Sequence, residues 1–213
     1  MCYFLFERIF VMKALRFLTA VFMSIFVGGA FGVYARDKDN IEDINNKLVR
    51  FHIIANSDTD EDQQLKMELR EYMFRNIKFD KNAEKNDVIK YFSENKEELQ
   101  ENINTFLKTK NSSYTAEVNV EKEYFSVRKY NNFVLPAGNY DAVVVKIGEA
   151  KGQNFFCVMY PSLCYVDSIS GDIKGNMEEL KKVLTDEQIN LIEKNKGETV
   201  VKFKIVEILN KIF

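Results

Sequence analysis

The feature that most constrains this chain is an uncharged apolar run at residues 17–35, FLTAVFMSIFVGGAFGVYA. It follows Lys13 and Arg16, and it ends in a small-x-Ala pattern before the polar residues 36–37. A basic lead, an apolar middle and a small-residue exit are typical of a secretory signal. The length of the run is also near the lower limit for a membrane-spanning helix, which needs roughly 17–25 residues. We therefore expect residues 1–35 to be a signal peptide or an N-terminal membrane anchor, with Lys13 and Arg16 on the cytoplasmic side.

The remaining segment, residues 36–213, has the length of one domain. Met12 also begins a signal-like stretch, so translation from Met1 or from Met12 fits the pattern. The whole chain has a net charge of −2, and removing three basic and one acidic residue with the lead leaves −4. This mildly acidic balance argues against nucleic acid and against anionic lipid as main partners. Contact with a membrane is expected only through the N-terminal segment.

The spacing of apolar residues predicts helices early in the domain and strands later. Residues 50–55 predict a central strand because both of its faces are apolar. A polar turn and a long amphipathic helix over residues 59–78, capped by Asp58 or Thr59, follow. The other predicted helices are 41–49, the region 87–108, which a second cap at Ser93 would divide, 176–184, and one from the capping box at 185–188 to Gly197. The predicted hairpins pair strand 114–120 with 124–129 and strand 140–147 with 155–160. Polar breaks are predicted at 80–86 and 171–175, and a further strand at 199–206. The fold class is α+β, with an antiparallel or mixed sheet.

Two cysteines, Cys157 and Cys164, lie in the predicted exported domain, while Cys2 lies in the lead. A lone pair at this spacing in an exported domain predicts a disulfide. Two buried free thiols remain the alternative, because cysteine is also a common small core residue. A metal site is not expected, since the chain has one histidine and no further cysteine nearby.

The acidic turn after the first strand invites comparison with a calcium-binding loop, because Asp58, Asp60 and Asp62 alternate. The comparison fails at both decisive positions, where Gln63 replaces glycine and Leu69 replaces glutamate. Capping of the following helix explains these acids better, since negative charge is favoured in a first helical turn. No metal and no cofactor are therefore expected.

His52 is the only histidine of the chain. With Cys157 or Cys164 it would form the thiol–base pair of a hydrolase. The alternatives are a structural histidine in the sheet or a pH-sensitive group without a catalytic task. No phosphate-binding glycine loop, serine-nucleophile motif or zinc-protease motif occurs. The residues alone therefore predict an exported binding protein rather than an enzyme.

Residues 50–73, RFHIIANSDTDEDQQLKMELREYM, resemble the signature segment of the stage II sporulation protein R family of endospore-forming Firmicutes. Residues 133–167 are also similar, including the turn at 135–138, the glycine-flanked loop at 148–152 and both cysteines. One mild departure is Phe155-Phe156, where the family often has tryptophans. The signature residues that match are Arg50, His52, Ile54, Ala55, Asn56, Ser57, Asp58, Glu61, Asp62, Gln63, Leu65, Lys66 and Arg70.

The resemblance implies a protein made in the forespore and exported to the space between forespore and mother cell. There it would activate the membrane-embedded aspartic protease of the mother cell, stage II sporulation protein GA, which removes the pro-sequence of sigma-E. A polar turn on a rigid scaffold is a common place for a contact surface. The residues expected to bind the partner are Asn56, Ser57, Asp58, Asp60, Glu61 and Asp62. Two alternatives remain: an extracytoplasmic Cys/His hydrolase acting on cell wall or peptide, and a permanently anchored sensor or structural domain.

Overall fold

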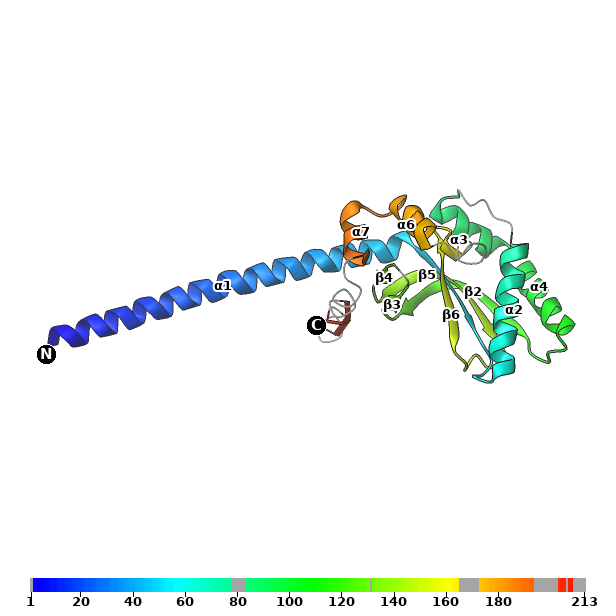
Figure 1. Ribbon diagram of the computed structural model, residues 1–213, viewed down its shortest axis with the longest axis horizontal. Helices are drawn as coiled ribbons and strands as arrows, with labels where there is room; N and C mark the ends of the chain where they lie inside the picture. The colour runs from blue at the N-terminus through cyan, green and yellow to red at the C-terminus, as the bar shows by residue number, and fades with distance from the viewer. Residues whose placement is uncertain are drawn as a thin grey trace. The chain divides into compact units, whose positions relative to one another are not determined.

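The computed structural model describes residues 2–77, 83–130, 132–164, 173–193, 203–205 and 207–208. They divide into two compact units, Met1–Asn40 and Ile41–Phe213. The predicted α+β class with a mixed sheet is confirmed. In chain order, the elements (Figure 1) are α1 (Cys2–Lys47), β1 (Val49–Ile54), α2 (Asp60–Asn76), α3 (Lys85–Glu94), α4 (Lys96–Thr109), β2 (Ala116–Phe125), β3 (Arg128–Lys129), β4 (Val134–Leu135), β5 (Gly138–Ile147), β6 (Asn154–Tyr160), α6 (Ile173–Lys181) and α7 (Asp186–Glu193).

The first unit is helical and contains the apolar run of α1. The side chains described in this run are largely exposed, including Phe17 and Phe22. Among the residues that the structure describes, no helix combines the length and the apolar character needed to cross a membrane. The signal peptide or anchor stays a prediction.

The second unit is built on a four-stranded sheet with the order β2-β5-β1-β6. The predicted central position of β1 is confirmed, because β1 runs parallel to β5 and antiparallel to β6. Phe51 lies between Val143 on one side and Cys157 on the other. β2 completes the sheet antiparallel to β5.

One face of the sheet carries the main hydrophobic core beneath α2, α3 and α4. Side chains alternate between the faces of a strand, so Phe51 and Ile53 of β1 point into this core. Both are fully buried, and each such side chain contributes about 1.5–3 kcal/mol to folding. The core is completed by Val143 and Val145 of β5 and by Leu69, Met73, Phe92, Ile103 and Leu107 of the helices.

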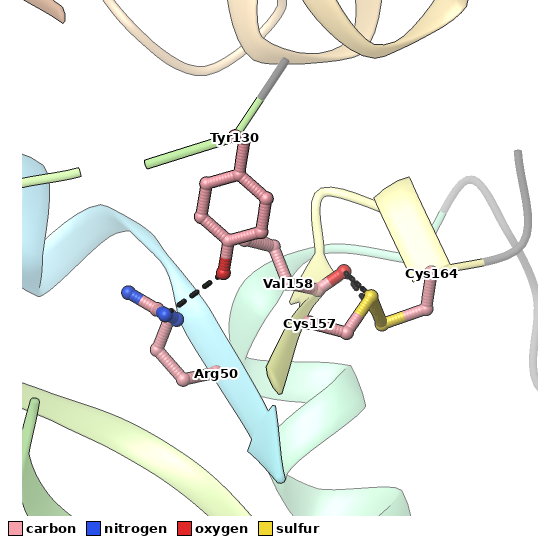
Figure 2. Close-up of a disulfide and its surroundings, with 5 residues drawn as sticks. All are labelled: Arg50, Tyr130, Cys157, Val158 and Cys164. Atoms are coloured by element: carbon pink, nitrogen blue, oxygen red, sulfur yellow. Dashed lines mark hydrogen bonds between the residues drawn. A yellow bond between two sulfur atoms is a disulfide. The ribbon is translucent and has the colours of Figure 1, made fainter. Parts of the chain in front are cut away.

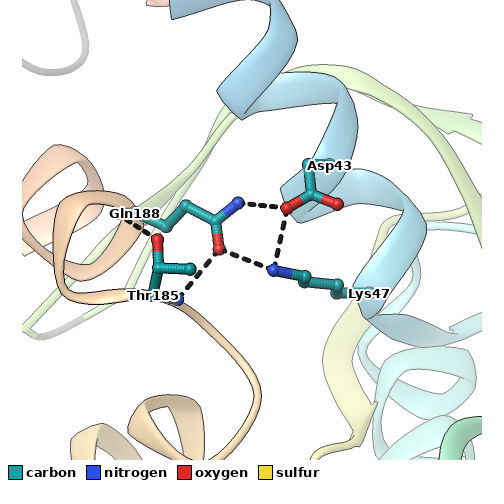
Figure 3. A network of polar contacts seen from close by, with 4 residues as sticks. All are labelled: Asp43, Lys47, Thr185 and Gln188. Atoms are coloured by element: carbon teal, nitrogen blue, oxygen red, sulfur yellow. Dashed lines mark hydrogen bonds and ion pairs between the residues drawn. The ribbon is translucent and has the colours of Figure 1, made fainter.

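The opposite face of the sheet carries Arg50 and His52, which are also buried. Here Arg50 donates a hydrogen bond to Tyr130, which follows β3 in the small β3–β4 sheet. Side-chain contacts hold α7 against the end of α1 (Figure 3). Gln188 of α7 donates to Asp43, accepts from Lys47, and forms the predicted capping box with Thr185. The capping box is therefore confirmed, and Gln188 has a second role in packing.

The predicted hairpin of strands 114–120 and 124–129 is wrong. Residues 116–125 form one continuous strand, β2, which pairs with β5 along its whole length. The charged stretch 121–123 was expected to be a turn, but it lies inside this strand. β2 is at the edge of the sheet, where charged side chains can reach solvent without breaking the ladder.

The predicted hairpin of strands 140–147 and 155–160 is also wrong in its pairing. Both strands exist as β5 and β6, but β1 is inserted between them. The loop after β5 therefore passes the end of β1 to reach β6, so β6 does not lie next to β5. Two strand spacings amount to roughly 10 Å, which this loop is long enough to cover.

Several boundaries differ from those predicted. The helical region 87–108 is two helices separated at Asn95, so the division expected at Ser93 is present two residues later. The helix predicted at 41–49 is the end of α1. α6 begins inside the loop predicted at 171–175. The strand predicted at 199–206 is wrong where it is described, because residues 203–205 are helical. The ion pair of Lys204 with Glu207, three residues apart, is consistent with a helical turn. The prediction was wrong because a short apolar run does not distinguish a helix from a strand. Residues 78–82 and Gly197 lie outside the described residues.

The predicted disulfide is present, and it joins Cys157 of β6 to Cys164 in the short helical segment that follows (Figure 2). Both cysteines are buried, with exposed fractions of 4% and 0%. Cys157 lies on the core face beside Phe51, so the bridge holds the segment after β6 against the main core. The structure therefore contains a disulfide and not the alternative of two buried free thiols.

Replacing both Cys157 and Cys164 by alanine should lower the free energy of unfolding by about 2–3 kcal/mol, because the closed loop is short. Urea unfolding of the full chain, with and without reductant, measures this difference. Reductant should abolish it. Thiol titration of denatured, unreduced chain should detect Cys2 alone, and reaction at all three cysteines would contradict the bridge.

Candidate functional site

The signature turn (residues 56–62) connects the end of β1 to the start of α2. It lies against the loop between β5 and β6, residues 148–153, which we call the crossing loop. Backbone hydrogen bonds join the two segments directly: Gly152 donates to Ala55 O over 2.9 Å and Lys151 donates to Asn56 O over 3.1 Å. These bonds continue the contact of the β1 segment with the rest of the sheet past the last residue of β1, Ile54.

Two side chains of the signature turn also accept hydrogen bonds from the crossing loop. Asn56 Oδ1 accepts from the backbone nitrogen of Glu149 at 3.0 Å, and Asp58 Oδ1 accepts from that of Gln153 at 2.6 Å. Lys66 of α2 donates to Gln153 O at 2.9 Å. Asn56 and Asp58 thus have structural roles as acceptors for the crossing loop.

Asp62 organises the inside of the signature turn. Its carboxylate accepts hydrogen bonds from Ser57 Oγ at 2.6 Å and Asn56 Nδ2 at 2.8 Å, and its backbone nitrogen donates to the helix cap Thr59. Burial alone would raise the pKa of Asp62, but hydrogen bonds from Ser57, Asn56 and Tyr114 outweigh it and lower that pKa. Asp62 is therefore a carboxylate at neutral pH, and the donors around it stabilise its charge.

Two glycines allow the close approach of the crossing loop. A Cβ on Gly152 would lie 2.1 Å from Ser57 O, and one on Gly148 would lie 2.4 Å from Asn56 Oδ1. Gly148 also has φ of +56°, a left-handed conformation that favours glycine. The spacing of these glycines in the sequence is explained by this contact.

The six residues predicted to bind a partner therefore separate into two groups. Asn56, Ser57, Asp58 and Asp62 make the internal contacts described above. Asp60 and Glu61, in the first turn of α2, are exposed to solvent. A partner-binding role stays a prediction for all six, and the exposed pair is best placed for it.

In the acidic turn, the carboxylate of Asp62 accepts an N–H group of Asn56 and the O–H group of Ser57 through the same oxygen, Oδ2. Among the residues that the structure describes, no group of three or more His, Cys, Asp or Glu side chains is placed to hold a metal ion.

His52 lies on the opposite face of β1 and is 3% exposed. Its ring packs between Phe125 and Phe156, with centroids 5.3 Å and 5.5 Å away. Burial, followed by the nearby charges of Arg50, Lys146 and Arg128, lowers the pKa of His52 to about 4. Its Nε2 is 2.7 Å from Glu123 Oε2, and burial raises the pKa of that carboxyl. Because the imidazole is neutral at pH 7, this contact is not an ion pair of two full charges.

Arg50 is the most buried cation of the same face, with no exposed surface. Its guanidinium lies over the ring of Phe125 at 4.5 Å and that of Tyr140 at 5.0 Å, and it donates to Tyr130 Oη at 2.9 Å (Figure 2). Such aromatic contacts stabilise a buried cation by roughly 2 kcal/mol or more when it is desolvated. Arg50 and His52 of the signature segment are thus core residues of the second face.

The Cys/His pair required for a thiol hydrolase is not assembled. His52 pairs with Phe156 across β1 and β6, and Cys157 is the next residue, so its side chain lies on the other face of the sheet. Its sulfur is bonded to Cys164 and cannot form a thiolate. The structure places the two predicted groups apart.

Sequence reasoning missed the partner of the signature turn. Gln63 and Lys66 belong to the resembling segment, and the crossing loop belongs to the second one, but nothing in the pattern joined them. In the structure Gln63 Nε2 donates to Ser57 O at 2.9 Å, and Lys66 donates to the crossing loop. The two glycines that flank the tight loop, Gly148 and Gly152, were the available signal.

The part of the chain that contains this arrangement is similar to known proteins. The family model described as stage II sporulation protein R matches residues 45–170, which include β1, the signature turn and the crossing loop. The chain belongs to the stage II sporulation protein R family. The chain is also 28% identical over 186 residues to stage II sporulation protein R of Bacillus subtilis (strain 168), covering 80% of this chain and 83% of that protein. No solved structure matches. Membership identifies this chain as a sporulation protein.

Replacing Asn56 by alanine should lower the free energy of unfolding by about 1–3 kcal/mol. The substitution leaves the Glu149 amide without its acceptor and removes one donor from Asp62. Leaving polar groups unpaired in this way costs free energy of folding. Urea unfolding of the full chain measures this change in the free energy of unfolding. Asn102→Ala, an exposed position on α4, is the matched control and should change stability little. Equal stability of both variants would contradict the role of Asn56.

The stability of the fold should decrease as the pH falls from about 6.5 towards 4. The folded protein keeps His52 neutral over this range while the unfolded chain binds a proton, so acid favours unfolding. His52 should lower the free energy of unfolding by on the order of 2 kcal/mol between pH 7 and pH 5. The raised pKa of Glu123 partly offsets this loss.

Because the chain has one histidine, an NMR titration of its ring reports this group directly. We expect no titration above about pH 5. A midpoint near the ordinary histidine value would contradict the buried, neutral state. In urea unfolding, His52→Gln should show a weaker loss of stability between pH 7 and pH 5 than the unchanged chain.

Proposed function

We propose that this protein is an exported signal of sporulation that activates the mother-cell aspartic protease, stage II sporulation protein GA. The protease would then remove the pro-sequence of sigma-E. Membership in the stage II sporulation protein R family is the observation that carries this proposal. The family match covers the part of the chain in which the signature turn and its partner loop lie.

Export is supported by the sequence and is compatible with the disulfide. The apolar run at 17–35 follows Lys13 and Arg16, as in a secretory signal. Disulfides persist mainly in compartments outside the reducing cytosol. We propose that the domain acts in the space between forespore and mother cell, either released or held by its N-terminal segment.

Action by contact, without catalysis by this chain, is supported by the second face of the sheet. The rival hydrolase needs a thiolate beside His52, but the sulfur of Cys157 is bonded to Cys164 and faces the other way. His52 itself is buried among Phe125, Phe156 and Glu123, where a cell-wall or peptide substrate has no access. These contacts favour a binding protein.

The mechanism follows from differential affinity. A ligand shifts its receptor only towards the state that it binds more tightly. An aspartic protease that completes its pair of catalytic carboxylates from two chains would be activated by a ligand that favours the dimer. Asp60 and Glu61 are suited to this contact because they are exposed on a turn that internal hydrogen bonds hold in place.

Deletion of the gene in its sporulating host should leave cells with unprocessed sigma-E precursor. A copy expressed only in the forespore should restore processing, because the signal is made there and acts across the membrane. The same copy without residues 1–35 should fail to restore it. Immunoblots for the precursor and for mature sigma-E measure the result. Normal processing in the deletion strain, or full restoration by the copy that lacks residues 1–35, would contradict the proposal.

A further inference from the structure

A groove of about 400 Å³ lies between the first two turns of α2 and the connection from α4 to β2. One side is formed by Glu61, Gln64, Leu65 and Glu68, and the other by residues 110–114. The volume is at the small end of the range for ligand-binding clefts. The groove adjoins the signature turn and shares Glu61 and Asp62 with it.

Both sides of the groove are fixed before any ligand binds. On the far side, Asn111 follows the C-cap of α4 and has φ of +56°. Ser112 N donates to Leu107 O at 3.1 Å, and Asn111 N donates to Lys108 O at 3.0 Å. This pattern is a Schellman motif, which stops a helix in a defined geometry. Across the groove, Lys110 and Glu68 form an ion pair of 2.8 Å. A preformed site binds without the cost of ordering its sides.

The groove carries an excess of negative charge. Its charged residues are Glu61, Asp62, Glu68 and Lys110. The hydrogen bond from Lys110 lowers the pKa of Glu68, so these two groups neutralise each other as an ion pair. Asp62 is ionised but its oxygen accepts internal donors. Glu61 is therefore the exposed carboxylate of the groove that has no ion pair in the described part of the chain.

Polar groups beside Glu61 can bind a peptide backbone. The exposed amide of Gln64 and the hydroxyls of Ser112 and Ser113 line the same groove. Leu65 and the ring of Tyr114 provide partly buried apolar surface for the stem of a long side chain. Lysine and arginine both combine such a stem with a terminal cation.

We propose that this groove binds an extended segment of the partner protein that carries a lysine or arginine, with its cation paired to Glu61. The proposal rests on the proposed function, because the partner is the receptor of the signal. An acidic segment is excluded by repulsion from Glu61 and Asp62. A small apolar ligand is disfavoured because most of the lining is polar and open to solvent.

The test uses the full chain in mild detergent, titrated with a short glycine–lysine peptide while amide chemical shifts are recorded. Shifts should be largest at Glu61, Gln64 and residues 110–114, and they should weaken as salt rises. The matching glycine–glutamate peptide should not cause them. Asn76 and Asn95, which line a different hollow in the described part of the domain, serve as an internal control. Equal shifts with both peptides, or none in the groove, would overturn the proposal.

Glu61→Lys should weaken binding of the glycine–lysine peptide by at least roughly 1.5-fold to fivefold at low salt, the range expected for the loss of one exposed charge pair. The matched control is Glu71→Lys, the same change at an exposed site on α2 outside the groove, and it should bind as the unchanged chain does.

In the sporulating host, Glu61→Lys should reduce processing of the sigma-E precursor, whereas Glu71→Lys should not, at equal amounts of exported protein. If deletion of the gene blocks processing but Glu61→Lys does not, the groove proposal fails and the proposed function stands. If deletion has no effect, the proposed function fails by itself, and the peptide titration still decides the charge preference of the groove.

Discussion

The hydrogen bonds from the crossing loop to Asn56 and Asp58 are the constraint on which the rest of the structure depends. β1 is inserted between β5 and β6, although these two strands follow each other in the chain. The loop that connects them must therefore cross the end of β1, where backbone groups would lose their partners. The signature turn supplies acceptors at that point, and glycines at 148 and 152 let the two segments approach.

This constraint links the sequence to the proposed activity. Because Asn56, Ser57 and Asp62 satisfy one another and the crossing loop, the start of α2 has one defined position. Asp60 and Glu61 are held on the outer side of a rigid turn, so a partner would meet two carboxylates in a fixed arrangement. The same residues that build the fold thus determine where the exposed charges lie.

The parts of the fold that depend on local chemistry could be predicted from the sequence. The spacing of apolar residues predicted β1 and α2, and Thr59 was one of the predicted caps of α2. The spacing of Thr185 and Gln188 predicted the capping box. The pairing of strands could not be predicted, because an inserted strand and a hairpin have the same local pattern. The charged residues 121–123 suggested a turn because sequence does not show that β2 is an edge strand.

The candidate site shows the same division. The turn at residues 56–62 was recognisable, but its partner lies 93 positions away from Asn56 in the sequence, beyond the reach of any local pattern. The buried states of Arg50 and His52 could not be predicted either, because they depend on aromatic rings from β2, β5 and β6.

Hydrogen exchange of the backbone amides in the crossing loop tests the central constraint most directly. The amides of Glu149, Gly152 and Gln153 should exchange nearly as slowly as that of Val144 in the centre of the sheet, because opening them requires separation of the signature turn from the loop. Exchange at the rate of an exposed loop would show that the two segments are not held together, and would contradict this account.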